Sequence, residues 1–300
     1  MNVIDIHIKN EKMGNFLALF PLGDEHFESE VHRKSSMQYI KDSIKEVREM
    51  FKVPLGFIKL GDELEYDRQS FSEKLQAVGK PSDRKGHETM AKNLVKRLVY
   101  NYDGMFKKGD LKMAAVSGNH KVNFTIGHKE IADMRSGVVP HLNSSHMLAE
   151  MLGFPYMGDG HCKINIHLHR GESRKVYKIL ILHGEGAGSS AKADITEFQR
   201  IRAMYGELDL IIKAHSHKPM TMHMGRFDTD FTSRDKEVEV EETTIINVGS
   251  CRGSMAIGHT DYGEKKQYTP IPTRFPFIIL KSHTTHRRGS VWIKAIPITF

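Results

Sequence analysis

The chain has 300 residues, a formal net charge of +7 and a pI near 9.2, and 27% of its residues are charged. This length permits one large domain or two ordinary ones, and the ordinary charged fraction excludes a disordered polyelectrolyte. Two cysteines, Cys162 and Cys251, exclude a disulfide scaffold and a four-thiolate zinc site. The basic balance is a weak indication of a polyanionic partner.

We expect neither a membrane-spanning nor a targeting segment. The longest apolar runs, such as residues 275–280, fall far short of the roughly 20 residues that a membrane helix needs. Residues 1–10 contain no basic region followed by an apolar stretch, so no signal peptide is expected. We therefore expect a cytoplasmic protein that does not contact a membrane.

Strands and helices are predicted to alternate in the first half of the chain. A buried strand over residues 15–22 precedes a helix over 33–51, in which Met37, Ile40 and Ile44 share one face. Residues 69–87 are polar and read as a loop or linker. Further strands are predicted over 54–60 and 111–116, and further helices over 88–106, 125–134 and 144–152.

The second half is richer in strands. Apolar and polar residues alternate over 161–169, which is typical of a strand with one wet face. Other predicted elements are strands over 176–182, 209–214, 237–248, 274–280 and 291–300, and a helix over 194–205. We predict one α/β domain over residues 1–300, with parallel strands in its first half and a mixed or antiparallel second half. The strand-rich part, about 220–300, is expected to complete the second sheet.

Side chains that can bind metal follow five of the predicted apolar strands. In chain order they are Asp24 and His26, Asp62, Asn119 with His120, His183, and His215 with His217. Ligands of open α/β sheets bind beyond the carboxyl ends of the strands, so we expect these side chains to meet at one edge. Carboxylate, imidazole and amide groups suit manganese, zinc or iron. The set is too large for one ion and fits two ions that share a carboxylate, a centre that attracts phosphate.

The ordered blocks DEH, GD, GNH, H and AHSH resemble the motifs of the calcineurin-like metallophosphoesterase superfamily, over roughly residues 15–220. The resemblance implies a four-layer α/β/β/α sandwich, with two mixed β-sheets flanked by helices. Ala214 stands where the family has glycine, and Lys121 stands where it has an acidic residue after GNH. The C-terminal stretch after residue 247 resembles phage and prophage members, for which the setting would be the host cytoplasm.

The resemblance also implies two divalent ions, with Mn²⁺ favoured and Zn²⁺, Fe²⁺ or Ni²⁺ as alternatives. Asp62 would bridge the two ions, and His120 would stabilise the transition state or protonate the leaving oxygen. Glu65 would orient His120. The first ion would be held by Asp24, His26, Asp62 and His217, and the second by Asp62, Asn119, His183 and His215.

The predicted reaction is hydrolysis of a phosphate ester by a hydroxide that bridges the metal ions. The basic balance and Lys121 favour a phosphodiester, a nucleotide or nucleic acid, and Arg252 and Lys121 are candidate substrate contacts. One alternative is a phosphomonoesterase that acts on a small molecule or a phosphoprotein. Another is a non-catalytic nucleic-acid-binding or scaffold protein with an idle site. His167 and His169 share the spacing of the terminal histidine pair, but they read as residues on the polar face of a strand. Nothing in the sequence indicates an oligomeric state.

Overall fold

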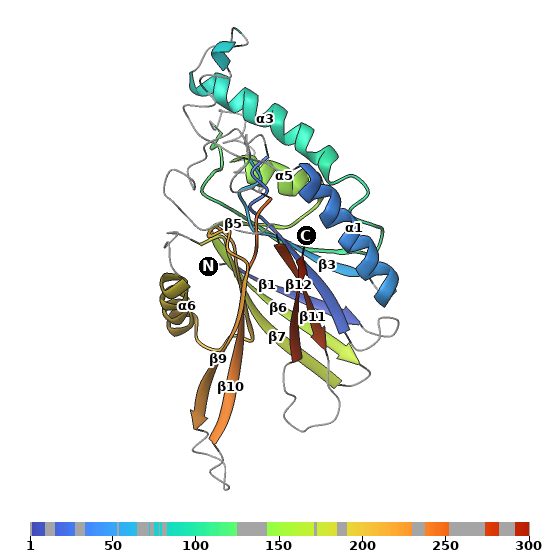
Figure 1. Cartoon of the computed structure of the whole chain (residues 1–300), viewed down its shortest axis with the longest axis vertical. Helices are drawn as coiled ribbons and strands as arrows, with labels where there is room; N and C mark the ends of the chain where they lie inside the picture. The colour runs from blue at the N-terminus through green and yellow to red at the C-terminus, as the bar shows by residue number, and fades with distance from the viewer. Residues whose placement is uncertain are drawn as a thin grey trace, which may run out of the picture.

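Two mixed β-sheets face each other across a shared apolar core, and helices cover their outer faces (Figure 1). The α/β/β/α sandwich predicted from the sequence is therefore confirmed. No helix in the described part of the chain is long and apolar enough to cross a bilayer. The computed structural model describes residues 2–9, 16–27, 34–52, 54–64, 72, 75–77, 79, 83–124, 143–170, 173–184, 191–229, 238–251, 274–281 and 292–299.

The first sheet has a parallel half and an antiparallel half. Its strands, in spatial order, are β12 (Trp292–Thr299), β11 (Arg274–Lys281), β2 (Phe16–Leu22), β3 (Leu55–Lys59), β4 (Leu111–Ser117) and β5 (Tyr156–Asp159). The strands from β2 to β5 are parallel. Strand β2 is wholly apolar because both of its faces are covered: Ala18 and Phe20 face the helices, whereas Leu17 and Leu19 face the other sheet.

The second sheet contains the strand with alternating polarity. Its order is β1 (Asn2–Lys9), β6 (His161–Arg170), β7 (Ser173–Leu182), β8 (Leu210–Lys213), β10 (Val238–Asn247) and β9 (Met220–Thr229). Ile164 and Ile166 of β6 point into the core between the sheets. The C-terminal strands divide between the sheets, with β9 and β10 here and β11 and β12 in the first sheet. The sequence had assigned all of them to the second sheet.

Among the described residues, three helices cover the first sheet and one covers the second. They are α1 (Lys34–Phe51), α3 (Arg84–Asn101) and α5 (Ser144–Leu152) on the first, and α6 (Ala191–Tyr205) on the second. Helix α3 begins before its predicted start at residue 88, because the Asp83 side chain caps it by accepting a hydrogen bond from Gly86 N (2.8 Å). Helix α5 has its predicted bounds, between Asn143 as N-cap and left-handed Gly153 as C-cap. The helix predicted over 125–134 lies outside the described residues.

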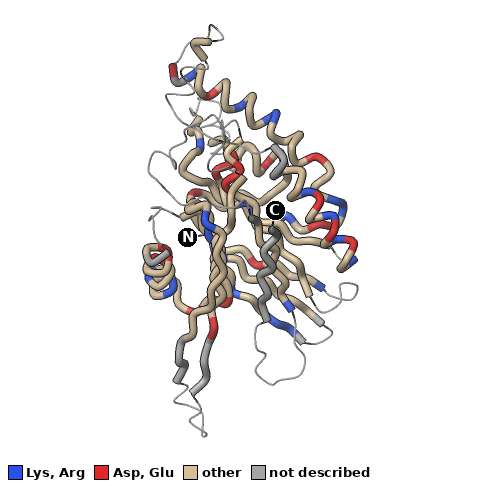
Figure 2. Tube along the Cα trace, in the orientation of Figure 1, with Lys and Arg blue, Asp and Glu red and all other residues tan. Residues whose placement is uncertain are grey.

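The excess of basic residues does not gather on one element. In the view of Figure 2, Lys and Arg lie on α1, α3 and α6 and on several strands, with acidic residues among them. The net charge therefore does not by itself mark a single docking surface.

The ends of five strands meet at one edge of the sandwich. In the first sheet, Asp24 N donates a hydrogen bond to Gly61 O (3.0 Å), which joins the turns after β2 and β3. In the second, Ala214 N donates to Leu182 O (3.2 Å), which joins the turns after β7 and β8. His183 Nδ1 lies 2.8 Å from Leu60 O and so links the two sheets. The parallel strands thus deliver their polar end residues to one place.

Candidate metal centre

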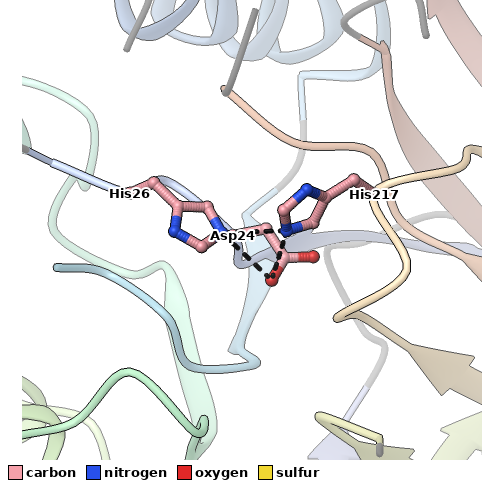
Figure 3. Close-up of side chains that lie close together, drawn as sticks. All are labelled: Asp24, His26 and His217. Atoms are coloured by element: carbon pink, nitrogen blue, oxygen red, sulfur yellow. Dashed lines mark hydrogen bonds and ion pairs between the residues drawn. The ribbon is translucent and has the colours of Figure 1, made fainter. Parts of the chain in front are cut away.

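The first group at this edge consists of Asp24, His26 and His217. Their potential ligand atoms all lie within 4.8 Å of one another. The Nε2 atoms of His26 and His217 are 2.9 Å apart, and each faces Asp24 Oδ1, at 4.0 and 3.9 Å (Figure 3). Asp24 and His26 come from the turn after β2, whereas His217 follows β8. Residues separated by almost two hundred positions therefore converge on one point.

The second group consists of Asp62, His183 and His215, again within 4.8 Å of one another. His183 Nε2 lies 3.0 Å from Asp62 Oδ2 and 3.2 Å from His215 Nδ1. Since the Leu60 carbonyl can only accept, His183 Nδ1 donates to it and Nε2 faces the group. This backbone contact fixes the orientation of the ring, as outer partners of metal-binding histidines commonly do.

Asn119 and His120 lie against these groups. Asn119 Oδ1 is 2.9 Å from both His183 Nε2 and His215 Nδ1, so it faces the second group. The His120 ring packs edge-on to that of His26, with 5.1 Å between centroids, and His120 N donates to Asp62 Oδ1 (2.8 Å). His120 is half-buried, and it belongs to neither group of potential ligands.

The two groups are in direct contact. His215, a member of the second group, donates its backbone N–H to Asp24 Oδ2 of the first (2.8 Å). Asp24, His26, Asp62 and His183 are buried, whereas His215 and His217 are half-buried and Asn119 is exposed. The combined centre is therefore open to solvent on the side of Asn119, His215 and His217.

The backbone is unusual at the same positions. Among the described residues, six that are not glycine have positive φ, and five of these lie in the two groups: Asp24, His26, Asp62, His215 and His217. Such conformations cost on the order of 1–3 kcal/mol each and cluster at functional sites. The turns also approach each other closely, since a Cβ on Gly118 would lie 1.9 Å from Asp62 Oδ1. Glycine at residue 118 therefore leaves the space that this carboxylate occupies.

Asp62 and His183 form a buried ion pair. Burial would raise the pKa of Asp62, but the hydrogen bond and charge of His183 outweigh it and hold that pKa well below its usual range. Burial likewise would lower the pKa of His183, but the hydrogen bond and charge of Asp62 raise it to about 9. At neutral pH the imidazole therefore carries a proton that a bound cation would displace.

The pKa values of Asp24 and His215 are shifted in the opposite directions from those of Asp62 and His183. Burial raises the pKa of Asp24 to about 7, against the opposing charges of His183 and His26. Burial and the neighbouring charge of His183 lower the pKa of His215 to about 4. His215 is therefore neutral at physiological pH, which is the form of histidine that binds metal.

The residues fit a pair of divalent ions. Every donor is a carboxylate, imidazole or amide group, a set suited to manganese, zinc or iron. Buried Asp24 Oδ1 has no hydrogen-bond partner among the described residues, although it faces two imidazole nitrogens. A cation shared by these three atoms would satisfy that oxygen. The two His/Asp groups are therefore consistent with a dinuclear metal site.

The remaining predicted residues fall outside the two groups. Lys121 Nζ lies 3.0 Å from Asp159 Oδ2, so its ammonium forms an ion pair with β5. Glu65 and Arg252 lie outside the described residues, and their roles stay predictions. His167 is buried on the outer face of β6, with its Nε2 2.9 Å from Asp5 Oδ1. His169 Nε2 lies 3.1 Å from His7 Nδ1. Neither histidine belongs to either group of potential ligands.

Sequence reasoning missed the partners behind the centre. The Leu60 carbonyl leaves no signal in the sequence, because any residue supplies one. Lys59 does leave a signal: it is a lysine at the end of a strand whose other residues are apolar or glycine, two residues before Gly61. A buried lysine needs a carboxylate, and the structure supplies Glu25, which lies between Asp24 and His26 in the chain.

No protein-family model matches the chain, and no curated protein matches it. Among solved structures, this chain is similar to a conserved uncharacterized protein from Streptococcus pneumoniae TIGR4, which is described as a predicted phosphoesterase. The two sequences are 10% identical, the TM-score is 0.32, and the alignment covers 94% of this chain and 98% of that one. A protein of unknown function from Aquifex aeolicus is 16% identical with a TM-score of 0.33, covering 85% and 95%. A protein described as the anchor in the inner membrane complex of Plasmodium is 11% identical with a TM-score of 0.41, covering 95% and 90%.

None of these three is described as a phage protein, so the resemblance to the phage branch stays a prediction. The identities and TM-scores of these structures are too low to assign a function to this chain.

Proposed function

We propose that this protein is a metal-dependent phosphoesterase, and that its substrate is a phosphodiester such as a nucleotide or nucleic acid. One observation carries the proposal: two His/Asp groups, each compact enough for one ion, touch through the bond from His215 N to Asp24 Oδ2. Two divalent ions held there would lower the pKa of a shared water and offset the charge of the phosphoryl oxygens. The preference for a diester rests on the basic net charge and on Lys121.

The protein's own residues would act in three ways. Asp24, His26 and His217 would hold one ion, and His183, His215 and Asn119 the other. Asp62 would bridge them, with its Oδ1 fixed by His120 N and its Oδ2 facing His183. The His120 ring lies beside the centre and is half-buried, so it is placed to give a proton to the leaving oxygen.

The test is hydrolysis by protein that has been stripped of metal and then loaded with Mn²⁺. Bis-p-nitrophenyl phosphate and p-nitrophenyl phosphate would compare diester with monoester, and nucleotides and DNA would follow. We expect faster turnover of the diester, and loss of that turnover in Asp62→Asn. Asp110→Asn is a matched control, because Asp110 is a half-buried aspartate paired with Arg48 away from the centre.

The outcomes separate the alternatives. Faster turnover of the monoester would replace the diester preference with phosphomonoesterase activity. Tight Mn²⁺ binding without hydrolysis of any ester would favour an idle site in a binding or scaffold protein. Hydrolysis that survives Asp62→Asn unchanged would place the activity elsewhere and refute the proposal.

A further inference from the structure

A buried lysine lies directly behind the candidate metal centre. Lys59 ends β3, and its side chain is only 1% exposed. Its Nζ lies 2.5 Å from Glu25 Oε1 and 3.8 Å from Glu63 Oε1. It also donates a hydrogen bond to Tyr102 Oη (2.7 Å), and Tyr102 Oη donates in turn to Glu25 Oε1 (2.8 Å). We call Lys59, Glu25, Glu63 and Tyr102 the Lys59 network.

Both carboxylates of the network are immediate neighbours of candidate metal ligands. Glu25 lies between Asp24 and His26, and Glu63 follows Asp62. The backbones of the two turns are also joined, because His26 N donates to Asp62 O (3.0 Å) and Phe27 N donates to Glu63 O (2.8 Å). The Lys59 ammonium group therefore contacts one carboxylate in the turn after β2 and one in the turn after β3, and each belongs to a chain neighbour of a candidate ligand.

The charge balance of the network depends on that ammonium. Glu25 and Glu63 are both buried, and each costs several kcal/mol to bury as an ion without a partner. Ser145 Oγ donates to Glu63 Oε2 (2.8 Å), but a hydroxyl does not neutralise a carboxylate. Without Lys59, the two carboxylates would lose the ammonium group that contacts both of them. Their side chains would move, and the turns that carry Asp24, His26 and Asp62 would move with them.

We infer that Lys59 is a positioning residue of the metal centre, which holds the turns after β2 and β3 in the conformation that binds cations. The inference rests on the proposed function, and it adds a requirement that neither His/Asp group reveals. Loss of an outer partner of a metal ligand commonly weakens metal affinity on the order of 10–100-fold. We expect an effect of that size from Lys59→Met, which keeps the length of the side chain and removes its charge.

A second, partly buried ion pair supplies the matched control. Arg48 Nη2 and Asp110 Oδ2 are 2.5 Å apart, and Asp110 Oδ1 accepts a hydrogen bond from Leu55 N at the other end of β3 (3.1 Å). Neither residue neighbours a candidate metal ligand in the chain. Arg48→Met should therefore lower the stability of the protein without changing its affinity for metal.

The experiment is calorimetric titration of Mn²⁺ into the metal-stripped full chain, with the thermal unfolding midpoint of each metal-free variant measured beside it. We expect Lys59→Met to bind Mn²⁺ at least tenfold more weakly than wild type, and Arg48→Met to bind it within twofold. Equal affinity in Lys59→Met and wild type would overturn the inference while leaving the proposed function intact. Equal weakening in both variants would also overturn it, because the effect would then be general destabilisation.

The test also holds if Lys59→Met fails to fold or if the wild-type protein fails to bind Mn²⁺. If Lys59→Met does not fold, Tyr102→Phe is the second variant, because it removes the hydroxyl that accepts from Lys59 and donates to Glu25 while it leaves every charge in place. It should weaken Mn²⁺ binding at least about threefold, the smallest effect expected from losing hydrogen bonds to charged groups. Wild-type affinity in Tyr102→Phe would then count against the network. If wild-type protein binds no Mn²⁺, the proposed function fails, and this inference fails with it.

Discussion

Substitution of Gly118 by alanine tests how closely the metal centre depends on the approach of its turns. A Cβ at this position would lie 1.9 Å from Asp62 Oδ1, 2.6 Å from its Cγ and 2.7 Å from its backbone N. Side-chain carbons essentially never come closer than 3.0 Å to such atoms, so the carboxylate must move by at least about 1 Å. Ligand distances in metal sites tolerate only about 0.2 Å, and a misplacement of about 1 Å commonly costs on the order of 100-fold in rate.

We therefore expect Gly118→Ala to lose on the order of 100-fold in diester hydrolysis and at least tenfold in Mn²⁺ affinity. The assays are turnover of bis-p-nitrophenyl phosphate and calorimetric titration of Mn²⁺. Gly104→Ala is the control, because nothing lies within 4 Å of an added Cβ there and its positive φ should cost only about 1 kcal/mol of stability. Wild-type affinity and rate in Gly118→Ala would refute the placement of Asp62 as a shared ligand.

Three other predictions follow from the same centre. His120→Ala should lower the turnover number on the order of 100-fold or more and leave the Mn²⁺ affinity within a few-fold of wild type, because His120 lies beside the two ligand groups and belongs to neither. A loss of Mn²⁺ affinity as large as the loss of turnover would make His120 a metal ligand instead. The affinity for Mn²⁺ should rise from pH 6 to pH 9, because Asp24 (pKa about 7) and His183 (pKa about 9) lose their protons when the metal binds. Calorimetric titration in buffers of different ionisation enthalpy would detect the released protons. An affinity that does not change with pH would contradict the assignment. Free Mn²⁺ at a hundred times its dissociation constant should stabilise the fold by about 2.7 kcal/mol per site. Thermal unfolding with and without a chelator would measure this effect. An unchanged unfolding midpoint would mean that no ion binds the native state.

The sequence predicted those parts of the protein in which local pattern and long-range structure agree. Strand β2, which ends at Leu22, is covered on both faces, and its uniform apolar character predicts this from the sequence. Because polar residues follow each strand and parallel strands share an edge, the groups around Asp24 and Asp62 were expected to meet. The structure brings them together, and their role as metal ligands stays a prediction.

Other features depend on partners that are distant in the chain. Strand β1 pairs with β6 in parallel, with Ile6 opposite Ile166, and eight residues at the start of the chain give no indication of that partner. Strand β5 has only four residues, too few for a periodic pattern. The ion pair of Lys121 with Asp159 likewise depends on the place of β5 beside β4, so the sequence alone suggested a free cation near the substrate.

The left-handed backbone at five of the candidate ligands also restricts how this centre can change in evolution. Asp, Asn and His enter that conformation more readily than other residues except glycine, whereas β-branched residues are strongly disfavoured. The conformation and the chemistry therefore select overlapping sets of residues. A lineage that abandons catalysis would keep its fold most easily by exchanging Asp24 or His215 for asparagine or glycine. An inactive descendant would accordingly retain the shape of the centre long after it had lost the capacity to bind metal.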